Sequence, residues 1–213
     1  MKLKNTILYS GWIAAAAMAV VMVGSGFQAA QEKSGVIDMN QVIQNSNVGK
    51  KNSQKLKDSI TARTSLIDMV ETYPVMTTEQ AESLKQLMLK EVPTAADKAA
   101  VEKIKGDLLA SDKKRSELMG KSTLTESERQ LLTEYSQRVR ANEQRLDVWQ
   151  REFSNEISDI RDGMMTDLLT AAKSSLKDVA KQQGFNTVFN SEVAPYGAND
   201  LTDATVKALD AKK

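Results

Sequence analysis

The chain has 213 residues, of which 27% are charged and only 5% aromatic; this balance disfavours a large globular core and favours long, charged helices. Lysine and arginine total 29 and aspartate and glutamate total 28, so the net charge of +1 disfavours a generally basic nucleic-acid-binding protein. The chain contains no cysteine and no histidine, which excludes disulfide bonds, thiolate zinc sites, cysteine nucleophiles, histidine bases and lipid attachment to a cysteine.

Residues 1–30 are predicted to be a cleaved export signal peptide. Lys2 and Lys4 form a basic start, the apolar run Ile7–Val23 follows, and small residues come after it. The run has seventeen residues, which is short for a membrane span, and a retained membrane anchor is the alternative. Loss of the two lysines leaves 27 basic residues against 28 acidic ones, a net charge of −1.

The mature chain is predicted to begin with a short strand and a first helix. Gly35–Asn40 contains Val36 and Ile37, which suit a pleated surface. The first helix is expected from Lys50 to Thr72. Pro74 ends it, because proline disfavours helical geometry in the residue before it.

Three further helices are expected to begin at threonine N-caps, each followed three residues later by a side chain that completes a capping box. The pairs are Thr77 with Gln80, Thr94 with Asp97, and Thr125 with Glu128. Pro93 and Gly120 separate these helices from one another.

The stretch Thr125–Gln183 is predicted to form one long helix, because it contains no proline and only one glycine, Gly163. Apolar or small residues recur along it at steps of three and four. From Leu132 to Phe153 the steps alternate strictly, as in a left-handed coiled coil, and Asn142 fills one place as a candidate for fixing register. Such a helix is roughly 85–90 Å long, so its apolar stripe needs partners.

After the long helix, Phe185–Asn190 is predicted to be a second strand, with Phe185 and Phe189 on one face and Val188 on the other. Val193–Tyr196 is expected to be an edge segment or loop, and a short helix follows from Asp200. Two isolated strands are marginal in water, so further strands are expected from other copies of the chain.

The predicted fold class is mainly α with a small β body: a long antiparallel helical hairpin, a coiled-coil tentacle, projects from a small sheet that oligomerisation completes. The β body is assigned to residues 31–48 and 184–213, and the arm to residues 49–183 with breaks near 73–77, 92–94 and 120–125. The outbound helices, laid end to end, reach about 90–95 Å, which matches the return helix. The alternative is that residues 74–124 form a helical knob at the end of a shorter stalk.

The two ends of the mature chain resemble the OmpH family of periplasmic chaperones, the Skp type. The resemblance lies in Val36–Ile43 with Gly49–Lys51, in Val179–Phe189, and in Asp200–Leu209. It implies a homotrimer with an interlocked β body, from which helical hairpins extend around a cavity. It also implies an ATP-independent holdase for unfolded outer-membrane β-barrel proteins, with no catalytic residues, no cofactor and no metal.

Two features depart from the family's pattern. Many members are clearly basic, whereas the mature charge here is near neutral, which weakens the case for contact with lipopolysaccharide or acidic lipid. The outbound side is also interrupted at Pro74 and Pro93, so arm shape and cavity size are expected to differ.

Candidate site residues fall into two sets. The oligomerisation body is assigned to Val36, Ile37, Met39, Phe185, Val188 and Phe189, and candidate client contacts are Lys113, Lys114, Arg115, Lys121 and Met165. A solvated helix face is the competing interpretation of the four basic residues.

Three positions on the long helix carry further expectations. Trp149 and Phe153 are expected to pack against the outbound helices rather than line a client cavity. Gly163 is either a flexible point or a crowded helix contact.

The second function considered is a non-catalytic coiled-coil scaffold or spacer of the cell envelope, anchored through an uncleaved N-terminal segment. N-terminal sequencing of the native protein distinguishes the chaperone with a cleaved signal peptide from the anchored scaffold, because an intact Met1 favours the anchor. An enzyme is disfavoured, because the sequence shows no glycine-rich phosphate loop, metal-ligand cluster or nucleophile–base set.

Overall fold

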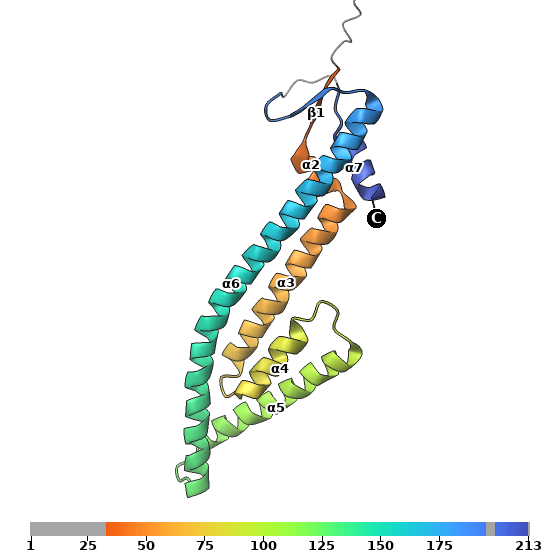
Figure 1. Ribbon diagram of the computed structural model, residues 1–213. Helices are drawn as coiled ribbons and strands as arrows, with labels where there is room; N and C mark the ends of the chain where they lie inside the picture. Colours follow the sequence, from red (N-terminus) through yellow and green to blue (C-terminus); the bar gives the residue numbers. More distant parts are fainter. Residues whose placement is uncertain (1–32, 195–198, 213) are drawn as a thin grey trace, which may run out of the picture. The chain divides into compact units, whose positions relative to one another are not determined.

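The computed structural model describes residues 33–194 and 199–212, which form two compact units (Figure 1). The sheet unit comprises residues 33–42 and 173–212, and the helical unit comprises residues 43–172. The predicted signal peptide and the second half of the predicted edge segment Val193–Tyr196 lie outside the described residues. The observed elements confirm the mainly α fold class with a small β body.

The sheet unit is built on two parallel strands, β1 (Ser34–Ile37) and β2 (Thr187–Asn190), paired from Ser34↔Thr187 to Ile37↔Asn190. Parallel strands need a long crossover connection, and the helical unit lies within this one. On the other side of β1, Val36 donates its N–H to the Asn199 carbonyl at 2.8 Å. A Cβ at Gly35 would lie 2.2 Å from a terminal methyl group of the buried Leu201, so a larger residue here would force that side chain to move.

The core of the sheet unit joins the end of α6 (Glu126–Gln183) to β2 and to α7 (Thr202–Ala211). Val179, Phe185 and Leu201 are buried together. Gly184, at φ 73°, ends α6 in a Schellman motif in which the Phe185 N–H donates to the Ala180 carbonyl at 2.8 Å.

One detail of the predicted second strand is wrong. Phe185 precedes β2 and is buried in the core with the partly buried Val188, whereas Phe189 is 43% exposed. The turn at Gly184 that ends α6 sets the direction of the Phe185 side chain. The alternation of side chains along β2 therefore does not apply to Phe185, which precedes the strand.

The helical unit contains part of α2 (Met39–Asn45), then α3 (Asn47–Thr72), α4 (Thr78–Met88), α5 (Ala95–Met119) and most of α6. The three predicted capping boxes are confirmed: each threonine oxygen accepts the backbone N–H three residues on, and each partner side chain accepts the threonine N–H. Local signals therefore place the helix starts.

The predicted end-to-end outbound path is wrong, and the knob alternative is closer to the structure. α4 packs against both α3 and α5, and Lys55 near the start of α3 reaches Glu91 after α4 at 2.8 Å, so α4 runs back along α3 (Figure 1). α5 then runs the other way, because Leu118 near its end is buried with Val75 just after α3. Burial of α4 and α5 against α3 and α6 favours this reversal over a straight arm.

The apolar stripe of α6 is confirmed along the helical unit. Tyr135, Trp149 and Phe153 are buried, and each belongs to a cluster with residues of the outbound side. Asn142 is also buried, and its side-chain amide donates to the carbonyls of Pro74 and Met76 at 2.7 and 2.9 Å. Asn142 therefore ties α6 to the turn where the chain reverses.

The start of α5 gives a pH-dependent prediction. The Lys90 ammonium and then the Thr94 N–H bond to the Asp97 carboxylate and lower its pKa from 3.8 to about 2. A lowered folded-state pKa stabilises the fold above the unfolded-state value, and that contribution is lost as the pH falls from about 3.8 towards about 2.

We expect Asp97→Asn to be less stable than the wild type at pH 7 and equally stable near pH 2. Urea unfolding at both pH values, followed by circular dichroism, measures the difference. A stability gap that is the same at both pH values would contradict this explanation.

Candidate functional site

The sheet unit brings four of the six predicted oligomerisation residues close together. Val36 lies opposite Phe189 in the strand register, while Phe185 and Val188 share one apolar cluster. Ile37 is buried and Met39 is half-buried. Among the described residues β2 has no strand on its other side, and the exposed Phe189 ring lies on this strand.

In the helical unit, the aromatic pair Trp149 and Phe153 forms the centre of the largest apolar cluster. The ring centroids are 5.7 Å apart, and the two side chains pack with Leu66 of α3, Leu84 of α4 and Leu108 of α5. Packing against the outbound helices, expected for both aromatics, is confirmed.

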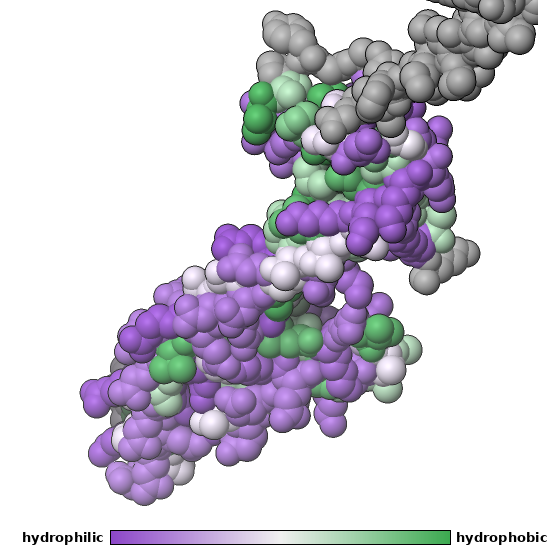
Figure 2. Space-filling view, turned by 45° about the horizontal axis from the view of Figure 1, so that its top comes forward, coloured by the Kyte–Doolittle hydropathy of each residue, from purple (hydrophilic) through white to green (hydrophobic). Residues whose placement is uncertain are grey.

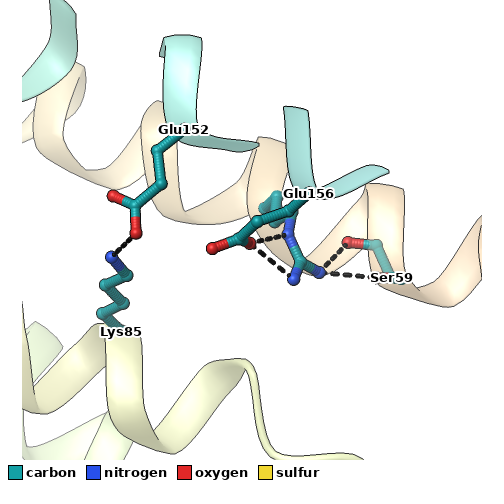
Figure 3. Close-up of polar contacts among 5 residues, drawn as sticks. Ser59, Lys85, Glu152 and Glu156 are labelled. Atoms are coloured by element: carbon teal, nitrogen blue, oxygen red, sulfur yellow. Dashed lines mark hydrogen bonds and ion pairs between the residues drawn. The ribbon is translucent and has the colours of Figure 1, made fainter. Parts of the chain in front are cut away.

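Three cations flank this aromatic pair, and one of them, the Arg145 guanidinium, lies 5.8 Å from the Trp149 centroid. The other two also form ion pairs with α6. The Lys85 ammonium lies 5.5 Å from both ring centroids, and the Arg63 guanidinium lies 5.7 Å from that of Phe153. Each is paired with a carboxylate of α6, Lys85 with Glu152 at 2.7 Å and Arg63 with Glu156 at 2.8 Å (Figure 3). These contacts join α3 and α4 to α6, so the cluster packs the helices of this unit together.

Met165 lies on a surface that is open to solvent. Together with Ile43, Leu56, Met164 and Leu168 it lines a hollow of about 540 Å³ between the start of α3 and α6. A second hollow, of about 520 Å³, is lined by Ile60, Ile67, Phe153 and Ile157, and Arg161 borders both hollows. Met165 is 44% exposed at the first hollow.

The four predicted basic contacts do not act as one free cluster. Lys113 and Lys114 are exposed on α5, whereas Arg115 lies 3.6 Å from Asp112. Lys121 lies in the turn after α5 and is bonded to Glu128 at 2.6 Å. Two of the four charges are therefore partly compensated by neighbouring carboxylates.

Sequence reasoning missed Lys50, Ile60 and Arg161 as lining residues of the hollows. Arg161 follows Ile160 of the apolar stripe. The stripe predicts which side of α6 is buried, but it does not predict where hollows remain between α3 and α6. Gly163 lies between Arg161 and Met164, which line the first hollow. No atom lies within 4 Å of the position of a Cβ there, so the crowded-contact interpretation of this glycine is wrong.

On the face of the molecule in Figure 2, hydrophilic side chains cover most of the helical unit and hydrophobic side chains gather in small separate patches. None of the helices in residues 33–194 and 199–212 combines the length and hydropathy that a membrane span needs. The same residues contain no group of acidic side chains placed to hold a metal ion.

Comparison with known proteins gives one match. Residues 33–209 match the family described as outer membrane protein, OmpH-like. Neither the curated proteins nor the solved structures contain a significant match to the chain.

Proposed function

The chain belongs to the OmpH family, and from this membership we propose that it is a periplasmic, ATP-independent holdase that binds unfolded outer-membrane β-barrel proteins. The observation that carries the proposal is the family match, which spans both strands, the long helix and most of α7. The long helices and the small sheet support it.

Physical chemistry supports a binding role without catalysis. Before insertion, a β-barrel protein exposes alternating apolar residues and unpaired strand edges, which aggregate in water. A hydrophilic helical surface with small apolar patches, as in Figure 2, suits many weak contacts and keeps the carrier itself soluble. Such contacts keep client molecules apart without a chemical step.

We further propose that three copies assemble through the sheet unit, with Val36, Ile37, Met39, Phe185, Val188 and Phe189 forming the shared body. A two-stranded sheet is marginal by itself, and the side of β2 away from β1 is open among the described residues. The exposed Phe189 ring on that strand supports burial by another copy.

Met165 is the client contact that the surface supports best, because it is 44% exposed beside an apolar hollow. Lys113 and Lys114 are secondary candidates for acidic client segments or lipopolysaccharide. Arg115 and Lys121 contribute less to such contacts, because Asp112 and Glu128 lie beside them.

The test uses the purified mature protein and a urea-unfolded outer-membrane β-barrel protein. On dilution of the urea, the chain is expected to keep the client soluble without ATP, as measured by light scattering. Serum albumin at equal mass concentration is the control. Client precipitation at the same rate in both samples would rule out the holdase.

A further inference from the structure

The charged residues that line the two hollows between α3 and α6 are all basic. Their lining residues include Lys50, Arg63 and Arg161 but no carboxylate, although the whole chain carries 29 basic and 28 acidic residues. A third hollow, beside Pro93, has Asp97, Lys98 and Glu102 in its lining and thus carries both signs.

The cations are only partly compensated by neighbours outside the hollows. Arg63 is paired with Glu156 at 2.8 Å and Arg161 with Asp162 at 3.0 Å, whereas Lys50 makes no ion pair with any residue that the structure describes. The hollows therefore combine an apolar floor with a cationic border, which favours an anionic group on an apolar ligand.

The length of this surface suits an extended peptide. Its lining residues on α6 run from Gln150 to Leu168, which corresponds to roughly 27 Å of helix. An extended chain covers that distance with about eight residues. Alternate side chains of such a peptide point to the same face, so its apolar residues can enter both hollows in one pose.

We propose that the two hollows together hold an extended client segment in which apolar residues alternate with aspartate or glutamate. The apolar side chains occupy the hollows beside Ile60 and Met165, which are 43% and 44% exposed, and the carboxylates lie near Lys50 and Arg161. This inference rests on the proposed holdase function. It specifies which segments of a client protein the helical unit of one subunit binds.

The first experiment compares two fluorescent ten-residue peptides that share their apolar residues at alternate positions. The remaining positions are glutamate in one peptide and lysine in the other. We expect the glutamate peptide to bind the full mature protein roughly tenfold more tightly at low salt, as measured by fluorescence anisotropy. The difference should shrink at high salt, because exposed charges are screened.

The second experiment reverses one charge of the surface. Arg161→Glu is expected to weaken binding of the glutamate peptide by roughly 5–20-fold and to strengthen binding of the lysine peptide. Arg151→Glu makes the same change on α6 at an exposed position outside both hollows, and it should leave the preference unchanged.

A cross-linking measurement keeps the proposal testable if Arg161→Glu does not fold. The natural chain has no cysteine, so a photo-reactive label on Met165→Cys reports this site alone. The glutamate peptide should cross-link to that variant and not to Val148→Cys, which lies 52% exposed in the wild type on another face of α6.

Equal binding of both peptides, or an equal effect of the two arginine variants, overturns the proposal. Binding of a fatty acid with no binding of either peptide also overturns it and assigns the hollows to an amphiphile. If the wild type prevents client aggregation while the peptide preference is absent, this inference fails and the holdase function stands. If the wild type does not prevent aggregation, the holdase function itself fails.

Discussion

Replacing Trp149 by alanine is expected to lower the free energy of unfolding by about 3–5 kcal/mol. Trp149 is only 3% exposed, and its ring packs with side chains of α3, α4 and α5. Truncation removes contacts on three helices at once and leaves a cavity. It also removes one of the two rings over which the Lys85 ammonium lies.

Urea unfolding followed by circular dichroism at a fixed protein concentration measures this loss. Val148→Ala is the matched control, because Val148 is the preceding residue of α6 and is 52% exposed. The control should change the free energy of unfolding by less than about 0.5 kcal/mol. A Trp149→Ala variant as stable as the control would show that α4 and α5 do not pack on α6.

Phe189→Glu is expected to convert the assembled protein into single subunits. In the proposed assembly another copy covers the Phe189 ring on β2. A glutamate there would bury an unpaired carboxylate, at a cost of several kcal/mol. About 3 kcal/mol is enough to weaken association more than a hundredfold.

Light scattering coupled to size-exclusion chromatography at micromolar concentration gives the particle mass. The control Val148→Glu introduces the same charge at an exposed site of the helical unit and should leave the mass unchanged. If Phe189→Glu retains the wild-type mass, the exposed face of β2 is not the subunit interface.

Local signals in the sequence were sufficient for most individual elements. The capping boxes at Thr77, Thr94 and Thr125 give the helix starts, and each is present with its bonds. The steps of three and four along α6 correctly predict its buried side, including the aromatic pair. These features depend on residues close together in the chain, so one sequence is enough to recognise them.

The arrangement of the outbound helices could not be predicted in the same way. Matching lengths favoured a straight path past Pro74, whereas long-range contacts decide the reversal there. The Asn142 amide bonds to the carbonyls of Pro74 and Met76, and Leu84 of α4 packs beside Trp149. The periodic pattern of the sequence predicts neither the hydrogen-bond partners of Asn142 nor the packing of Leu84 beside Trp149.

The candidate client surface has the same limitation. Met165 was recognisable from its place just beside the apolar stripe of α6. Lys50 lines the same hollow as Met165, and Ile60 lines the second hollow. Both belong to α3, more than a hundred residues earlier in the chain, and they contribute to this surface only because α3 and α6 leave hollows between them. The excess of positive charge at that surface becomes visible only when both helices are placed.

Native mass spectrometry of the mature protein mixed with an unfolded outer-membrane β-barrel protein tests the holdase proposal most directly. The account predicts a complex whose mass equals three subunits plus one client molecule, formed without ATP. Single subunits with no bound client, together with loss of the client to aggregates, would contradict it.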